Sequence, residues 1–295
     1  MPFLTILTPT YNRGYILHKV FESLKNQTNQ DFIWLIVDDG STDDTKELAS
    51  KFKADSPFEI RYIYKENGGK HTALRMGINI IDSELTAFLD SDDIFTHDAV
   101  ETIAERWNDC RKHPNIASVD FLKVYPDGSI IGDLYPKDGY ISNFIECRFN
   151  KNIKGDKAAA YRTDILKQFP FPDIKGVFIP EGIVWGKIGD KYDSIYYNKS
   201  ICICEYREDG ITKNVRKQIL QKKSTGIMMA SNSYLCFKRK LHLKRKFKIV
   251  VFWGACGLAA KIKIRDLLKE SNAPVLQFFC LPVSYVRYLL WKIRA

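Results

Sequence analysis

Short apolar runs alternate with amphipathic stretches through the first 90 residues of the chain. Four runs are largely apolar and bounded by polar residues, as buried strands are: 3–7, 32–37, 60–64 and 85–89. Three stretches between them place apolar side chains at helical spacing: 15–24, 45–52 and 71–81. This alternation predicts an α/β fold, in which a mostly parallel, Rossmann-like central sheet carries helices on its faces.

The pattern becomes less regular in the second part of the chain. A helix is expected over residues 98–112, and Pro126-Asp127-Gly128 predicts the turn of a hairpin. Composition then changes abruptly beyond Thr212. We therefore expect one domain over residues 1–212 and a separate extension over residues 213–295.

The net charge of +10 is unevenly distributed between these two parts. Residues 213–295 hold 19 lysine and arginine residues but only two acidic ones, Asp266 and Glu270, whereas residues 1–212 have an acidic balance. This asymmetry indicates an acidic globule with a basic, helical C-terminal extension. A hydrophobic content of 45%, with 18 Phe and 15 Tyr, is that of a folded domain and excludes a disordered chain.

The seven cysteines are scattered and odd in number, and no spacing among them is typical of a zinc site. This usage favours a reduced compartment. Because Met1-Pro2 leads directly into the first apolar run, no signal peptide is indicated, and a cytoplasmic location is expected.

An acidic cluster follows the apolar run 85–89. Asp90, Ser91, Asp92 and Asp93 then lie at the carboxyl end of a strand, where an α/β sheet opens its binding crevice. Three neighbouring carboxylates repel one another unless a cation is bound, and their oxygens suit Mg²⁺ or Mn²⁺. The ordinary alternative is a loop that caps the helix starting near His97.

Two further polar motifs end the first two predicted strands. Pro9, Thr10 and Tyr11 follow the first, and Asp38 and Asp39 follow the second. Turn formation and helix capping can explain each motif taken alone. Because the carboxyl ends of parallel strands share one edge of a sheet, all three motifs are expected to meet there.

Taken together, the motifs resemble those of the glycosyltransferase family 2 enzymes, which adopt the GT-A fold. Four motifs carry the likeness, in this order: TPTYNR at 8–13, DDGSTD at 38–43, NGGKH at 67–71 and DSDD at 90–93. The likeness spans about residues 1–210 and is densest within the first 100. It implies a nucleotide-binding half at 1–100 and an acceptor-binding half at 101–212.

The resemblance implies transfer of a sugar from a nucleotide donor, usually UDP-linked, with the help of a divalent metal. The carboxylate of Asp39, or that of Asp38, can accept a hydrogen bond from uracil N3–H. Tyr11 can pack against the base, with Pro9 and Thr10 shaping the loop. The same region would contact the diphosphate through Asn67, the backbone of Gly69 and the charge of Lys70.

For the acidic motif, the resemblance implies that Asp92 is the leading metal ligand, supported by Asp93. Asp90, with Ser91, would contact the ribose or the transferred sugar. A departure from the family pattern occurs at Arg75, where many members have Asn. Arg75 can reach a phosphate or pair with a surface acid.

Inverting members of the family use a carboxylate as general base, usually at the start of a helix downstream of the metal motif. Glu181, which follows Pro180, is the candidate here. The family pattern at this place is often Glu-Asp, whereas Gly182 follows in this chain. The alternative is a first-turn glutamate that interacts only with the helix dipole. Trp185 can stack on a sugar or pack in the core.

The basic extension has seven lysine and arginine residues within 238–248, followed by two uncharged stretches, 249–260 and 273–286. Both stretches fall short of the ~20 apolar residues that span a bilayer, so an interfacial anchor on an anionic membrane is expected. The aromatic residues expected to embed are Phe252, Trp253, Phe278, Phe279 and Trp291. Docking on the catalytic domain and a homodimer contact are alternatives, while nucleic acid is not expected, because no reading motif accompanies the charge.

The sequence thus predicts an enzyme on the inner face of the plasma membrane that transfers a sugar, with inversion, to a lipid-linked acceptor. That acceptor would be polyprenyl-linked or another cell-surface glycan. A sugar nucleotidyltransferase is one alternative, although residues 12–14 are sparse for its usual glycine-rich loop. A membrane-bound scaffold with a decayed nucleotide site is the other.

Overall fold

A computed structural model describes residues 3–205 and 224–293, so the domain boundary expected at residues 212 and 213 lies outside the described residues. One sheet contains nine strands in the order β3-β2-β1-β4-β8-β6-β9-β5, with β7 paired to β9. The strands are β1 (Leu4–Thr10), β2 (Phe32–Asp38), β3 (Glu59–Tyr64), β4 (Leu85–Phe88), β5 (Asp93–Phe95), β6 (Ile116–Val124), β7 (Tyr140–Ser142), β8 (Lys157–Arg162) and β9 (Asp193–Cys204).

The first four strands are parallel, as the sequence predicts. Thr10 pairs with Asp38 between β1 and β2, and Leu7 pairs with Phe88 between β1 and β4. Their carboxyl ends therefore share one edge of the sheet. Pairing is mixed in the second half, where β8 is antiparallel to β4 and β6 while β6 and β9 are parallel.

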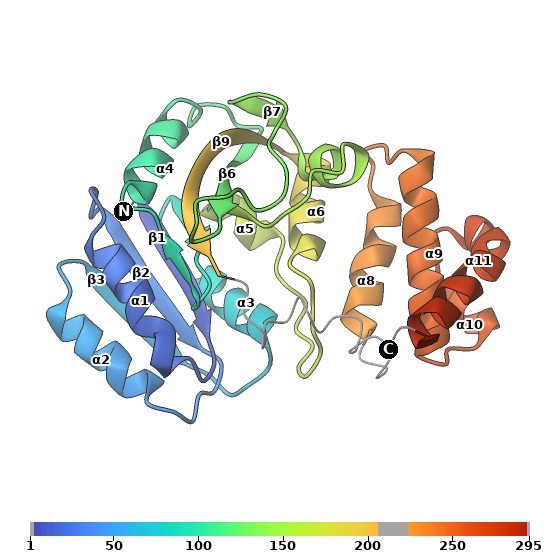
Figure 1. The fold of residues 1–295 in the computed structure, drawn as a ribbon, viewed down its shortest axis with the longest axis horizontal. Coiled ribbons are helices and arrows are strands. Elements are labelled where there is room, and N and C mark those ends of the chain that lie inside the picture. The colour runs from blue at the N-terminus through green and yellow to red at the C-terminus, as the bar shows by residue number, and fades with distance from the viewer. Residues whose placement is uncertain (1–2, 206–223, 294–295) are drawn as a thin grey trace.

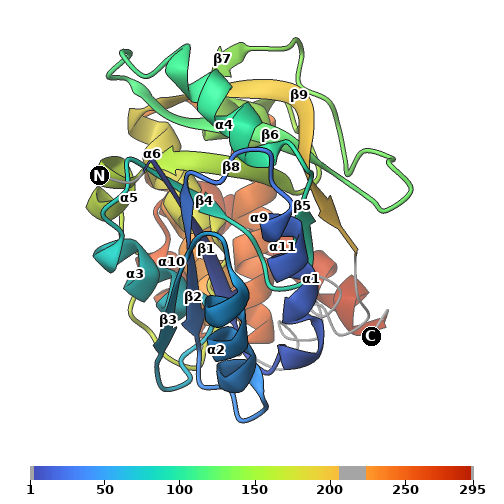
Figure 2. The same cartoon turned by 90° about the vertical axis from the view of Figure 1, so that its left-hand side faces the viewer.

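Two layers of helices cover the sheet (Figures 1 and 2). One face packs against α1 (Gly14–Lys25), α2 (Thr45–Asp55) and α4 (Ala99–Asn108). The other face packs against α3 (Lys70–Ile80), α5 (Thr163–Gln168) and α6 (Gly182–Lys191). The expected helices in the first half are thus confirmed, although α4 ends before the predicted Lys112, in turns that precede Pro114.

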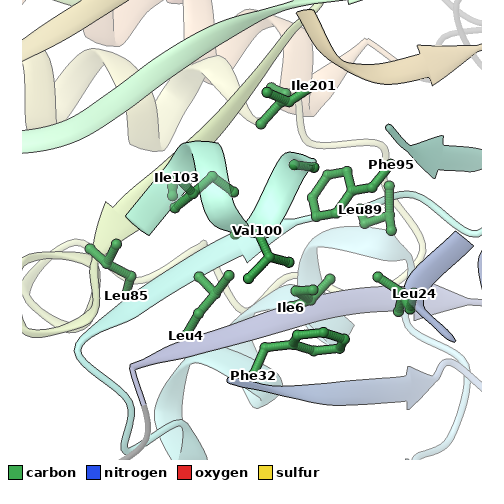
Figure 3. Close-up of a cluster of buried hydrophobic side chains, with 14 of the residues drawn as sticks. Leu4, Ile6, Leu24, Phe32, Leu85, Leu89, Phe95, Val100, Ile103 and Ile201 are labelled. Atoms are coloured by element: carbon green, nitrogen blue, oxygen red, sulfur yellow. The ribbon is translucent and has the colours of Figure 1, made fainter. Parts of the chain in front are cut away.

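The larger apolar core lies between the sheet and the first of these layers. Figure 3 shows Leu4 and Ile6 of β1 beside Phe32 of β2, with Val100 and Ile103 of α4 above them. β1 and β2 are buried along their whole length. This explains why both strands read as continuous apolar runs rather than as alternating ones.

The hairpin turn expected at Pro126-Asp127-Gly128 is confirmed. The amide of Gly128 donates to the carbonyl of Tyr125 over 2.9 Å, and Val124 bridges to Ile130. Gly128 has φ +83°, which favours glycine. A short π-helix, η1 (Ile145–Asn150), connects β7 to the chain that leads into β8.

The C-terminal part is helical, as expected. It comprises α8 (Thr225–Ser233), the 3-10 turn η2 (Tyr234–Cys236), α9 (Leu243–Ala259), α10 (Ile264–Glu270) and α11 (Pro274–Ile293). Figure 1 shows α8 facing α6, with α10 and α11 at the far end of the molecule. Among the described residues, no helix is long and apolar enough to cross a membrane.

Glycines on α6 allow the C-terminal part to pack closely against it. A Cβ added at Gly182 would lie 2.7 Å from Oη of Tyr234, and one at Gly186 would lie 2.8 Å from the ring of Phe237. Ala230 of α8 joins the same apolar cluster as Ile183 and Val184 of α6. The helix that begins next to Glu181 is therefore held between the sheet and the C-terminal helices.

Candidate active site

The loops after β1, β2 and β4 converge at the edge formed by the carboxyl ends of these strands. Asp38, at the end of β2, is 1% exposed, and its carboxylate accepts hydrogen bonds from the amide of Ser41 and from Oη of Tyr62. These contacts fix the turn that begins the 38–43 motif. Asp38 therefore has a structural task in this loop.

The carboxylate of Asp39 holds the glycine-rich loop. It accepts hydrogen bonds from the amides of Gly68 (3.0 Å) and Gly69 (2.7 Å), and it forms an ion pair with Lys65. Gly69 has φ +100°, a backbone conformation that favours glycine and aims its amide at the carboxylate. Asp39 thus joins the end of β2 to the predicted phosphate-binding loop.

Arg13 lies beside Asp92. Their charged groups are 3.5 Å apart, across the loops that follow β1 and β4. Partial burial and the neighbouring carboxylates of Asp90 and Asp93 raise the pKa of Asp92, and the charge of Arg13 opposes this only in part. Asp92 therefore lies in a partly buried place where three carboxylates of one motif are close together.

Lys70 bridges two carboxylates from distant parts of the chain. Its Nζ lies 2.6 Å from Oδ1 of Asp90 and 2.7 Å from Oε1 of Glu181. Partial burial acts to lower the pKa of Lys70, but the two carboxylates outweigh it and raise that pKa above its usual range. Burial likewise acts to raise the pKa of Asp90, yet Lys70 and Lys123 hold it below its usual value. Lys70 and Asp90 are thus both charged at neutral pH.

Asp93 points to a different partner from the rest of the acidic motif. It lies on β5, is 2% exposed, and forms an ion pair with Lys123 of β6 at 2.5 Å. The acidic motif is therefore divided, with each of its three carboxylates facing its own cation. Among the residues that the structure describes, no three His, Cys, Asp or Glu side chains are arranged to hold a metal ion.

The remaining predicted donor-binding residues line the same edge. Tyr11 is 48% exposed, whereas Thr10 is buried and its hydroxyl has no hydrogen-bond partner among the described residues. Nδ2 of Asn67 donates to the carbonyl of Asp39 over 2.9 Å. Pro9 is buried in β1, and Ser91 is buried in the loop after β4. The predicted residues thus gather at one edge of the sheet.

Glu181 immediately precedes the first residue of α6, as expected. The packing of Tyr234 against Gly182 gives a physical reason for the departure from Glu-Asp, since any side chain at position 182 would meet the Tyr234 hydroxyl. Trp185 stacks on Tyr161 with a centroid distance of 4.6 Å and also contacts Phe88, so it packs in the core. The core interpretation of Trp185, rather than sugar stacking, agrees with these contacts.

Arg75 has a hydrogen-bond partner other than the two expected from the sequence, a phosphate and a surface acid. Its Nη1 donates to the carbonyl of Phe171 over 2.6 Å. Nε2 of His71 similarly lies 2.8 Å from the carbonyl of Ile174. Both side chains of α3 therefore hold the segment that leads toward Glu181.

Sequence reasoning missed two cations, Lys65 and Lys123. Lys65 follows β3 at the same edge as the three motifs, and this position could have suggested a partner for Asp39. Lys123 lies near the end of the largely buried strand β6. A charged residue in a buried strand normally requires a partner of opposite charge, which is the signal that could have identified it.

The comparisons with known proteins bear directly on this site. The family model of glycosyl transferase family 2 matches residues 5–169, which include the four motifs and more than half of the chain. The chain belongs to glycosyl transferase family 2. The chain therefore has its family's motifs at the edge formed by the carboxyl ends of β1, β2 and β4.

Curated relatives differ in how much of their length the transferase covers. A glucosyltransferase of Campylobacter jejuni, described as GalNAc(5)-diNAcBac-PP-undecaprenol beta-1,3-glucosyltransferase, is 26% identical over 222 residues, 74% of this chain and 69% of its own. An uncharacterized glycosyltransferase of Rickettsia bellii is 33% identical over 141 residues, 45% of this chain. The chain spans only about a fifth of the length of that relative and of similar Rickettsia proteins.

Solved structures share the fold of the transferase. S. aureus TarS, residues 1–349 in complex with UDP-GlcNAc, is 17% identical with a TM-score of 0.59, covering 97% of this chain and 89% of that one. The mannosyltransferase PcManGT of Pyrobaculum calidifontis, in complex with GDP-Man and Mn²⁺, is 15% identical with a TM-score of 0.60, covering 98% and 87%. The predicted GT-A fold with C-terminal helices is confirmed.

Proposed function

We propose that the transferase moves a sugar from a nucleotide diphosphate donor, UDP-linked in our expectation, to an acceptor hydroxyl with inversion at the anomeric carbon. One observation carries this proposal: Lys70 touches both Asp90 and Glu181. A carboxylate expected to contact the donor and a carboxylate suited to be a base therefore flank a single ammonium group. Both carboxylates would therefore be within reach of a sugar bound beside Lys70.

Glu181 is the proposed general base. Its carboxylate would take the proton of the acceptor hydroxyl as that oxygen bonds to the anomeric carbon. The bond from that carbon to the diphosphate breaks at the same time, and the electron pair leaves on the phosphate oxygen. Lys70, displaced from Glu181 by the bound donor, would then face the diphosphate as a point charge.

The proposed metal site uses Asp92, with Asp90 beside it. The raised pKa of Asp92 supports this choice, because crowded carboxylates favour a cation. Mg²⁺ and Mn²⁺ are commonly held by one or two carboxylates together with phosphate oxygens and water, so a third protein ligand is not required. A divalent ion bound there would neutralise the leaving diphosphate. Asp93, which pairs with Lys123, would support the loop rather than bind the ion directly.

A lipid-linked acceptor is the proposed second substrate. The support is the likeness to the Campylobacter jejuni enzyme, whose printed name specifies an undecaprenol-linked acceptor and whose alignment covers 74% of this chain. The enzyme would then work at the inner face of the plasma membrane, where its acceptor is held. Family membership favours this activity over the nucleotidyltransferase and scaffold alternatives.

A donor screen with a matched variant tests the proposal. Purified protein is incubated with UDP-, GDP- and dTDP-sugars and Mn²⁺, first for hydrolysis and then with polyprenyl-diphosphate glycans as acceptors. Glu181→Gln keeps the shape of the side chain but cannot take the proton, so transfer should fall by about 10²–10⁴-fold while donor affinity stays unchanged. Normal transfer by this variant would exclude Glu181 as the base, and absence of turnover with every donor would favour the scaffold alternative.

A further inference from the structure

The helix α11 carries large apolar side chains on its solvent-facing side. Phe278, Phe279 and Ile293 are 60%, 72% and 80% exposed. They belong to a row of exposed apolar residues along one side of the helix: Val275, Phe278, Phe279, Val283, Val286, Leu289, Leu290 and Ile293. Contiguous exposed apolar surface on a folded protein marks a contact with a partner or a membrane.

The buried side of α11 has the opposite character. Apart from Trp291, its buried residues are small or polar: Gln277, Cys280 and Ser284. Gly254 of α9 lies so close to this side that an added Cβ would be 2.5 Å from both Gln277 Nε2 and Ser284 Oγ. Leu276, Leu281 and Tyr288 are partly buried against neighbouring apolar clusters, but most of the large apolar residues of α11 face outward, as in helices whose outer face meets lipid.

Positive charge predominates in the C-terminal part that carries this face. Residues 224–293 hold 13 lysine and arginine residues and two acidic ones, Asp266 and Glu270, which both lie on α10. Four exposed cations lie on and just before α10, which packs beside α11 at the end of the molecule (Figure 1): Lys261, Lys263, Arg265 and Lys269. On α11 itself, Lys292 is exposed near the apolar face. Cations beside an apolar face are complementary to anionic headgroups above acyl chains.

We propose that the outward face of α11 lies in the interfacial layer of an anionic bilayer, with the α10 cations against the headgroups. The face binds without crossing, since no described helix is long and apolar enough to span. A second copy of the chain fits less well, because a two-fold contact would bring like charges of the two copies together. This inference specifies the surface that brings the proposed transferase to its acceptor.

The structure also narrows the set of aromatic residues that were expected from the sequence to embed in the membrane. Trp253 and Trp291 are 2% and 9% exposed and belong to the apolar cluster between α9, α10 and α11. Phe252 packs against Trp291 with its ring centroid 5.7 Å away. Of the five aromatic residues expected from the sequence, Phe278 and Phe279 are therefore the two that face outward.

Vesicle sedimentation of the full chain tests the proposal. The wild type should bind vesicles of phosphatidylcholine mixed with phosphatidylglycerol more tightly than pure phosphatidylcholine, and high salt should weaken the binding. Phe278→Gln combined with Phe279→Gln should reduce binding to the anionic vesicles by about tenfold or more. The matched control is Leu134→Gln combined with Ile141→Gln, because those residues are 54% and 60% exposed on the catalytic part.

The other outcomes are equally decisive. Vesicle binding that is unchanged in the Phe278 and Phe279 variant would overturn the proposal. So would a fall in the solution mass of that variant from dimer to monomer, because the face would then be covered by a second copy. Hydrolysis of the nucleotide-sugar donor in solution is measured in parallel. Donor turnover that persists without vesicle binding would reject the membrane face while leaving the proposed transferase intact.

Discussion

The ammonium group of Lys70 lies 2.7 Å from the carboxylate of Glu181. The two residues are far apart in the sequence, and each stands at the start of a helix, α3 and α6. Lys70 also contacts Asp90, so the two parts of the chain that we expect to bind the nucleotide and the acceptor meet at one charged group. Substitution of this lysine should therefore affect both halves.

Lys70→Gln should weaken donor binding and slow transfer. Loss of the cation leaves Asp90 and Glu181 facing each other without compensation and removes a charge expected to meet the diphosphate, so the KM for the donor should rise about tenfold. Lys70→Arg keeps the charge and should lose less. Lys46→Gln, at an exposed position of α2, is the control. Steady-state kinetics decide, and a wild-type KM in Lys70→Gln would contradict the proposed contact.

Asp92→Asn should abolish the metal-dependent part of UDP binding. Calorimetry with and without Mn²⁺ measures it: the wild type should bind UDP more tightly with the ion, and the variant should show the same affinity in both conditions. Because burial and the neighbouring carboxylates raise the pKa of Asp92, removing its charge relieves desolvation and repulsion and should not lower the melting temperature. Asp98→Asn, at a residue paired with Lys199, should retain the Mn²⁺ effect.

Asp120→Asn should flatten the dependence of stability on pH. Asp120 is 8% exposed on β6, and burial raises its pKa from 3.8 to about 7, although hydrogen bonds from Ser118 and Ser194 oppose this. Between these two pH values the folded state keeps a proton that the unfolded chain releases, so stability falls as pH rises from about 4 to 7. The cost at neutral pH is on the order of 3 kcal/mol.

Denaturant unfolding at pH 5 and pH 8 measures this effect. The wild type should lose stability between the two values, whereas Asp120→Asn should lose less and should exceed the wild type at pH 8. Asp31→Asn, at an exposed loop position, should follow the wild type. Parallel pH profiles for the wild type and Asp120→Asn would show that the carboxylate is ionised in the folded protein.

Gly182→Ala should destabilise the packing of the C-terminal helices against α6. The new Cβ would lie 2.7 Å from the Tyr234 hydroxyl, and such overpacking costs about 1–3 kcal/mol. Helix propensity alone would predict that alanine raises the free energy of unfolding, so the sign of the measured change distinguishes propensity from overpacking. Tyr234→Phe removes the obstructing oxygen and should restore much of the loss in the double variant. Unfolding by denaturant provides the measurement, and a stabilised Gly182→Ala would refute the contact.

Sequence reasoning succeeded where structure depends on neighbouring residues. Each of β1, β2 and β3 is followed by its own helix, so the local alternation of apolar residues was enough to place β1 to β4 and their shared edge. The gathering of Tyr11, Asp39 and Asp90 at this edge followed from the parallel arrangement. The turn at Gly128 was likewise a local property.

Contacts between distant segments could not be predicted in the same way. The acidic motif was expected to act as one cluster, but Asp93 pairs with Lys123, and this pairing depends on β6 and β5 both lying beside β9. That order arises from crossovers with no local signature. The contact of Gly182 with Tyr234 likewise joins α6 to a turn in the C-terminal part.

The hydrogen bonds of Asp39 have a consequence for enzyme engineering. This carboxylate is buried, and the amides of Gly68 and Gly69 satisfy it from a loop almost 30 residues away. A chimaera that imports a foreign 65–69 loop to change the donor would leave the buried charge without hydrogen-bond donors unless the new backbone presents the same amides. The end of β2 and this loop should therefore be exchanged as one module.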